Sequence, residues 1–289
     1  MSPGNLVGRL SLSIPQVTAG RESDGDGGAE LAVRDWHLVV SRVVISLAFA
    51  LTLLFGVLDL NSPETHAHGL LCVPSRVART ALIAGLAVFT WRRGLERIDT
   101  GLIGAAMLVA LVGDIYLVRH REIMVGMGCF AAVQILLSTR HIRSILRIKH
   151  TTVPWWPIAL AFTGSGVVWA MVLSLIASTP YFVSFTLFLA LLTLSLGVAW
   201  GQVIRGGWQS PNDLEAALGM SLFYMCDVAF GVFSALSFLH AEGVGLARLA
   251  VDLCYTPALV LLVLSAHNWP IGFSRWLVRD RFANADQAA

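Results

Sequence analysis

Long apolar runs separated by short polar or basic segments dominate the chain between residues 36 and 269. A transmembrane helix needs about 20 mostly apolar residues, and eight runs come close to that length or exceed it. They cover about residues 38–60, 70–91, 100–118, 122–138, 154–177, 181–204, 214–239 and 246–268. The pattern therefore predicts an all-α, polytopic membrane protein with about eight transmembrane helices.

The two ends of the chain lack this pattern. Residues 1–35 are rich in Gly and Ser with an acidic stretch, which predicts a disordered cytoplasmic tail. Residues 36–269 form the predicted transmembrane domain, and residues 270–289 form a second cytoplasmic tail. Basic residues gather in cytoplasmic loops, and eight spans with both termini inside place most of the 20 Lys and Arg residues there. We expect a multi-pass protein of a cell membrane, the bacterial inner membrane.

Composition agrees with a membrane location. The chain is 56% hydrophobic and 13% charged, whereas soluble domains carry about 25% charged residues. The net charge of +2 and the lack of a basic domain predict no nucleic-acid partner, and the four cysteines form no CxxC pair. The basic connector at 139–150 is interpreted as topology-setting charge, with an amphipathic surface helix as the alternative.

Four carboxylates fall within or beside the predicted spans. Asp59 ends the first span, where a capping or interfacial role is expected. Asp252 follows Arg248 by one helical turn, which favours a local ion pair. Asp114 and Asp227 have no basic residue three or four positions away. An unpaired acid in hydrocarbon is costly and marks a functional site by default.

Asp114 and Asp227 match in depth and direction. Both lie about 20 Å from the cytoplasmic ends of parallel spans, at 1.5 Å per residue. Small residues precede each acid and allow close helix packing. We therefore predict that the two acids share a site. The alternative for each acid is that it stays protonated and forms a hydrogen bond to a neighbouring helix. Two such carboxyls favour one protonated and one ionised group, which suits cleavage through an oxocarbenium-like species; the substrate within reach is a lipid.

Other catalytic motifs are weak or missing. The sequence has no GxSxG and no HExxH. His66 and His68 lie near Glu64 in a predicted outer loop and leave a metal site there as a minor alternative. We predict no metal and no cofactor for the two-aspartate site.

Short motifs around the two acids match a known pattern at Gly113-Asp114, Gly126, Gly128, Phe130, Asp227, Tyr255 and Ala258. They resemble the TMEM86/YhhN family, integral membrane proteins that include lysoplasmalogenases. The resemblance covers about residues 70–268. The chain departs from the family at Gln134, Cys226 and Leu259, where the family has histidine, serine and glutamine, and Arg79 stands in for a family lysine.

This resemblance implies hydrolysis of the vinyl ether bond of a lysoplasmalogen, giving a fatty aldehyde and a glycerophospho-base. It implies catalytic roles for Asp114 and Asp227. Four further residues are expected to position substrate or water: Tyr255, Gln134, Tyr224 and Asp252. A lipid or small-molecule binder, a transporter, and an enzyme for another ether or ester lipid remain alternatives, and the sequence does not indicate the oligomeric state.

Overall fold

The computed structural model describes residues 36, 39–54, 72–91, 94–120, 122–147, 152–177, 182–206, 211–238 and 244–267. The chain divides into two units, Met1–Val40 and Ser41–Ala289, and α2 to α8 belong to the second. Within the described residues the regular secondary structure is helical, apart from one isolated bridge between Gly94 and His267. The predicted all-α class is confirmed.

One helix lies on each predicted apolar run. The first covers Val39–Leu54; the others are α2 (Cys72–Phe89), α3 (Arg97–Asp114), α4 (Ile123–Leu146), α5 (Trp155–Ile176), α6 (Phe182–Arg205), α7 (Asn212–Phe238) and α8 (Val244–Leu264). A π-helical segment, η3 (Ile115–His120), continues α3 directly after Asp114. The predicted tails at 1–35 and 270–289, Asp59, and the His66–His68 pair lie outside the described residues.

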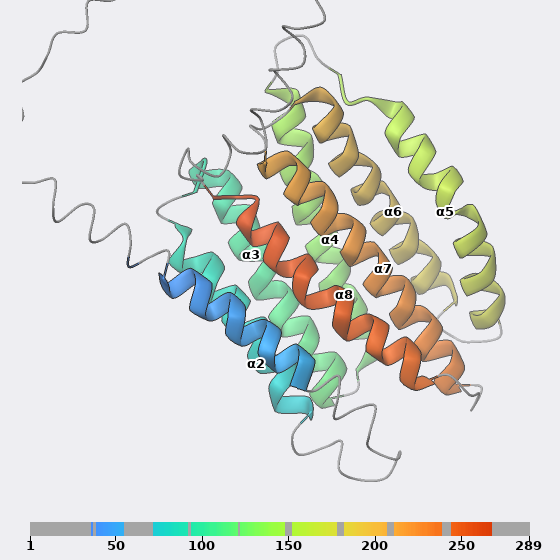
Figure 1. The fold of residues 1–289 in the computed structure, drawn as a ribbon. Coiled ribbons are helices and arrows are strands. Elements are labelled where there is room, and N and C mark those ends of the chain that lie inside the picture. Colours follow the sequence, from blue (N-terminus) through green and yellow to red (C-terminus); the bar gives the residue numbers. More distant parts are fainter. Residues whose placement is uncertain are drawn as a thin grey trace, which may run out of the picture. The chain divides into compact units, whose positions relative to one another are not determined.

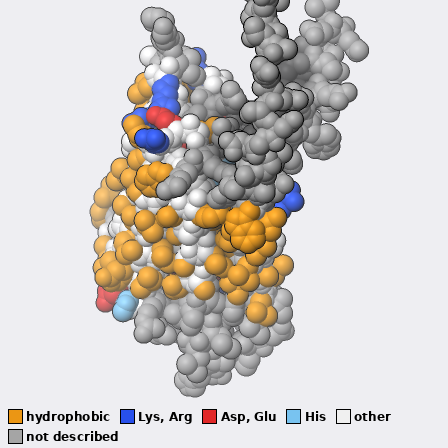
Figure 2. Space-filling model, turned by 90° about the vertical axis from the view of Figure 1, so that its left-hand side faces the viewer, with side chains coloured by type: hydrophobic (Ala, Val, Ile, Leu, Met, Phe, Trp, Pro, Cys, Tyr) orange, Lys and Arg blue, Asp and Glu red, His pale blue; other side chains and the backbone are white. Residues whose placement is uncertain are grey.

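Several of the helices have the length and the surface of membrane spans. Four of those described are long and apolar enough to cross a membrane: Arg97–Leu117, Ile123–Leu146, Phe182–Arg205 and Asn212–Val232. Large apolar side chains such as Leu108, Val125, Ile135 and Leu187 are exposed. Figure 2 shows hydrophobic side chains spread over the middle of one face, with charged side chains toward its ends. Such a surface is typical of contact with lipid, and the chain is a multi-pass membrane protein.

The helices pack around a common interior. α2 packs against α3 and α8, α3 against α4, α4 against α6, α6 against α7, and α7 against α8 (Figure 1). α5 packs on α6 and α7. Thr52 of the first helix is joined to Thr256 of α8 by a hydrogen bond of 2.6 Å between their hydroxyls. Fully buried side chains of α3, α4, α6, α7 and α8 fill the interior: Met107, Leu137, Leu192, Phe223 and Leu259.

A glycine brings α7 close to α8. A Cβ added at Gly219 would lie 3.0 Å from the Leu262 side chain and 3.2 Å from the carbonyl oxygen of Ala258. The small residues before Asp227 therefore allow the close approach that the sequence predicts. This contact sets the axial position of α7 relative to α8. It therefore determines which residues of α8 lie opposite Asp227.

The predicted end of the fourth span is wrong. The sequence predicts a helix over 122–138 followed by a basic connector, but α4 continues to Leu146. Arg140, the first arginine of that connector, is 1% exposed and forms an ion pair with Asp99 of α3, so it is not a surface topology charge. The helix continues because this arginine has a buried acid as its partner. Arg143 and Arg147 are partly exposed and lie against Glu96.

Candidate active site

Asp114 is held by hydroxyl groups from two other helices. It is the last residue of α3 and is 7% exposed. Its Oδ2 accepts a hydrogen bond of 2.5 Å from the hydroxyl of Thr80 on α2 and one of 3.0 Å from the hydroxyl of Tyr255 on α8. A carboxylate that accepts two O–H donors is well placed as an anion. The carboxyl is therefore fixed in position by α2, α3 and α8 together.

Asp252 and two arginines of α2 form a buried ionic cluster beside Tyr255. Asp252 is 1% exposed, and its oxygens accept hydrogen bonds from Arg76 at 2.7 Å and Arg79 at 2.8 Å. The Arg79 guanidinium carbon lies 5.4 Å from the centroid of the Tyr255 ring, within the range of a cation–π contact. Arg79 thus packs on the ring whose hydroxyl bonds Asp114.

The observed partners of Asp252 come from another helix. The sequence favours a pair with Arg248, one turn away, whose side chain lies outside the described part. The structure joins Asp252 to Arg76 and Arg79, more than 170 positions earlier in the chain. Two basic side chains neutralise this acid in the interior, so a positioning role suits it better than proton transfer.

Asp227 has a different environment. It lies on α7 and is 8% exposed, and its Oδ2 has no hydrogen-bond partner in the described part of the chain. Phe223, one helical turn before Asp227, contacts the ring of Tyr255, whose hydroxyl donates to Asp114. The structure therefore brings the two acids of α3 and α7 into one region, with donors on the first and an unpartnered oxygen on the second.

An aromatic cluster adjoins the acids. The rings of Phe130 on α4, Phe223 on α7 and Tyr255 on α8 lie 6.0 to 6.2 Å apart between centroids. Phe223 precedes Asp227 by one helical turn, and Tyr255 bonds Asp114 directly. Edge and tilted contacts of this kind favour a defined arrangement. The cluster therefore fixes the relative positions of the helices that carry the site.

Gln134 and Tyr224 are buried but do not bond the acids. Gln134 is 0% exposed, and neither its amide oxygen nor its amide nitrogen has a hydrogen-bond partner among the described residues. The Tyr224 hydroxyl is likewise buried and unpartnered there. Of the six predicted site residues, Asp114 and Tyr255 are bonded to each other. Asp252 reaches Tyr255 through Arg79, while Gln134 and Tyr224 form no bond with this group.

Sequence reasoning missed Thr80 and the pairing of the two arginines. Arg76 and Arg79 interrupt an apolar run, and a charge inside a predicted span requires a partner of opposite sign. That signal calls for a buried acid on another span, and Asp252 is such an acid. Nothing in the sequence marks the Thr80 hydroxyl as a donor to Asp114. In the described residues, no group of three His, Cys, Asp or Glu side chains is placed to hold a metal ion.

Together these features define a multi-pass helical membrane protein with two buried acids in its interior. A family model described as the YhhN family matches residues 75–266, which includes every side chain of the site. The chain belongs to the YhhN family, and the resemblance seen in the sequence is confirmed. Comparison with curated proteins and with solved structures gives no match.

The arrangement is suited to proton transfer. One carboxyl accepts two hydroxyl donors and the other keeps an oxygen without a donor in the described part. Donors stabilise the anionic form of a carboxyl, while burial without them favours the neutral form. A neutral acid beside an anion can give a proton to a bound substrate and then stabilise the cation that results.

Proposed function

We propose that this protein hydrolyses the vinyl ether bond of a lysoplasmalogen within the membrane, with Asp114 and Asp227 as the acid–base pair. The observation that carries the proposal is their contrasting surroundings. Thr80 and Tyr255 donate to Asp114, and the nearby Asp227 keeps a buried oxygen without a donor in the described part. Membership of the YhhN family supports a membrane protein of this class.

In this mechanism Asp227 is the general acid. Its proton adds to the vinyl carbon that is not attached to oxygen, and the double-bond electrons form the new C–H bond. A lone pair of the ether oxygen then gives an oxocarbenium ion, which the Asp114 carboxylate stabilises. Asp114 takes a proton from water as the water oxygen bonds the cationic carbon. The hemiacetal breaks its bond to the glycerol oxygen, which takes the proton held by Asp114, and the aldehyde leaves. The second water proton restores Asp227.

Tyr255 and Arg79 have supporting roles in this scheme. The Tyr255 hydroxyl keeps the Asp114 carboxylate oriented, and Arg79 packs against the Tyr255 ring while Asp252 holds Arg79. Each contact restricts a side chain that would otherwise rotate. Orientation of a catalytic group is worth a large part of a rate enhancement, so the ionic cluster contributes without touching the substrate.

The proposal includes a topology. Eight spans with both termini in the cytoplasm of a bacterial inner membrane account for the distribution of basic residues. In that orientation the C-terminal end of α3 faces outward, and Asp114 lies in the outer half of the membrane. The lipid then enters from the outer leaflet, its chain between helices and its head group near the outer surface.

The test is aldehyde release by the purified full chain. Incubation with lysoplasmalogen should give a fatty aldehyde, identified by mass, whereas the matching ester lysophospholipid should give none. Asp114→Asn and Asp227→Asn should each lower the rate by at least about a hundredfold, the range of a general acid or base. Glu122→Gln, which neutralises an exposed acid between η3 and α4, is the matched control and should retain the rate.

Two outcomes would contradict the proposal. If either aspartate variant released aldehyde at the wild-type rate, the two-acid mechanism would be contradicted. Lipid or solute flux in proteoliposomes, without any aldehyde, would favour the transporter alternative over the enzyme.

A further inference from the structure

A stripe of buried polar side chains runs along α4, away from the two acids. Gln134, Ser138 and His141 are spaced by four and three residues, and are therefore on one face of the helix. Their exposed fractions are 0%, 7% and 0%. Ser144, three residues after His141, is 1% exposed. The interior of an apolar helix bundle thus contains an uninterrupted series of polar groups.

Several of these groups have no partner in the described part of the chain. They are both amide atoms of Gln134 and the hydroxyls of Ser138 and Ser144. Other hydroxyls of the bundle bond their own helix, as Thr139 does with the Ile135 carbonyl at 2.7 Å and Ser221 with the Ala217 carbonyl at 2.9 Å. Ser138 and Ser144 do not make this local bond. A buried hydroxyl without a partner costs about 1 to 3 kcal/mol.

α6 adds to the stripe. Gln202 is 0% exposed, and its amide oxygen lies 2.7 Å from Nδ1 of His141. The Gln202 amide nitrogen has no partner among the described residues. Polar groups of α4 and α6 therefore face each other at this level. Buried water, with about three hydrogen bonds per molecule, is the usual partner for such groups in proteins.

The spacing along α4 suits single water molecules. The rise from Gln134 to Ser138 is about 6 Å, and the next two steps, to His141 and to Ser144, are about 4.5 Å each. One water molecule that makes two hydrogen bonds of about 2.8 Å spans about 5.6 Å. One molecule therefore spans either of the two shorter steps, and two molecules span the longer one, without a wide channel.

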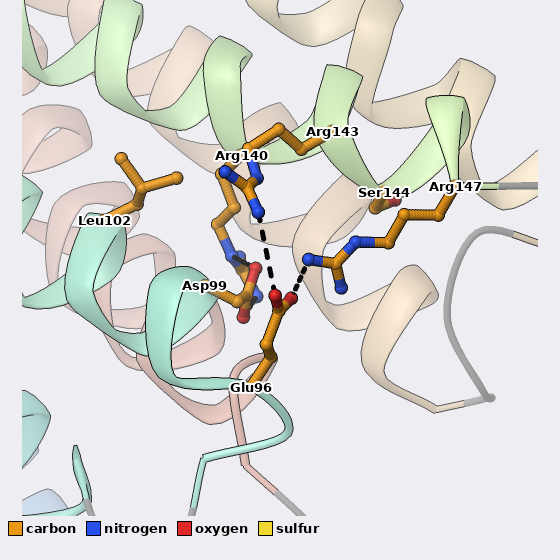
Figure 3. Close-up of a pocket in the computed structure, with 7 residues that line it drawn as sticks. All are labelled: Glu96, Asp99, Leu102, Arg140, Arg143, Ser144 and Arg147. Carbon is orange, nitrogen blue, oxygen red and sulfur yellow. Dashed lines mark hydrogen bonds and ion pairs between the residues drawn. The ribbon is translucent and has the colours of Figure 1, made fainter.

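The inner end of the stripe reaches a pocket. Ser144 lines this pocket together with Glu96, Asp99, Leu102, Arg140, Arg143 and Arg147, as Figure 3 shows. Glu96 lies between Arg143, at 3.6 Å, and Arg147. These three side chains are 32% to 45% exposed, so solvent reaches them. The pocket places a buried serine next to groups in contact with water.

The outer end of the stripe lies one helical turn from the aromatic cluster of the site. Gln134 is one turn beyond Phe130, whose ring contacts Tyr255 and Phe223. Tyr224, beside Phe223, has a buried hydroxyl that is unpartnered in the described residues. Side chains on a helix lean toward its N-terminus, which directs the Tyr224 hydroxyl toward the level of Gln134. The polar series therefore continues toward Asp227, one turn further along α7.

We propose that Gln134, Ser138, His141 and Gln202 hold a file of water molecules that connects the pocket at Ser144 with the two acids. Its role as the supply of the water consumed in each turnover rests on the proposed function. Its existence rests only on the buried polar side chains of α4 and α6. The file lets water enter at the end of the bundle opposite to the lipid.

The test is reaction of single cysteines with a water-soluble methanethiosulfonate in the full chain, after replacement of the four native cysteines. Ser138→Cys and Ser144→Cys are compared with Ile135→Cys, a position on the same helix that is 55% exposed toward the apolar surroundings. Because the thiolate is the reactive form and needs water, we expect Ser138→Cys to react at least about tenfold faster than Ile135→Cys.

Equal or slower reaction of Ser138→Cys would overturn the proposal. Gln202→Cys, on the facing helix, provides the same comparison if Ser138→Cys does not yield folded protein. The labelling experiment tests the water file, and the hydrolysis assay tests the proposed enzymatic function. Labelled Ser138→Cys in a protein that releases no aldehyde would support the file and contradict the enzyme. Aldehyde release with a protected Ser138→Cys would support the enzyme and contradict the file.

Discussion

Removal of Asp99 should destabilise the bundle far more than removal of its neighbour Glu96. Asp99 accepts two hydrogen bonds from Arg140, 2.7 Å from Nε and 3.1 Å from Nη2. The side chains of this pair are 6% and 0% exposed. Asp99→Ala leaves a guanidinium in the interior without its acid. Breaking a buried pair in this way costs about 3 to 5 kcal/mol.

Glu96→Ala is the matched control. Its arginine partners, Arg143 and Arg147, are 41% and 45% exposed, and an exposed pair contributes about 0 to 1 kcal/mol. The double variant Asp99→Leu with Arg140→Met should be more stable than Asp99→Ala, because apolar replacement of both partners removes the unpaired charge. The free energy of unfolding is measured by denaturant titration in mixed micelles. A loss for Asp99→Ala no larger than that for Glu96→Ala would refute the reasoning.

Two further outcomes follow from contacts at the site and between helices. Tyr255→Phe removes the 3.0 Å hydrogen bond to Asp114. Because a bond to a charged group is worth about 1.5 to 3 kcal/mol, aldehyde release should fall about tenfold to a hundredfold, and an unchanged rate would show that Tyr255 has no role in the reaction. Gly197→Ala places a Cβ 2.6 Å from a backbone atom of α5 and should lower the free energy of unfolding by about 1 to 3 kcal/mol. Gly128→Ala, with nothing within 4 Å of the added Cβ, should not lower it. Equal stability of the two variants in the same titration would contradict this packing.

The apolar pattern predicted the helices well. Every predicted run contains one helix, because a segment with no water to bond must satisfy its own backbone. The pattern failed at 139–146, where basic residues were interpreted as a connector although α4 continues. Arg140 is tolerated there by Asp99, which lies 41 positions earlier on another helix. Hydrophobic periodicity contains no information about such a partner.

The acids were found for a sound physical reason, but their partners were not. A carboxyl in an apolar run is rare enough to stand out, which is why Asp114 and Asp227 were identified from sequence. Positions three and four residues away share a helix face, and none of them carries a basic residue for Asp114 or Asp227. The observed partners of Asp114 and Asp252 come from α2 and α8 instead. Contacts between helices depend on packing, which spacing along one helix does not reveal.

The joining of Arg79 to Asp252 also bears on how the protein is made. The two residues are 173 positions apart, and a ribosome adds about 5 to 20 residues per second. Asp252 is therefore synthesised on the order of ten seconds or more after Arg79. During that time the arginines of α2 are part of the nascent chain without their acidic partner. Asp114 likewise precedes Tyr255 by 141 positions. The interior of this bundle can take its final form only after the last helix has been synthesised, so a chain truncated before α8 leaves its buried charges uncompensated.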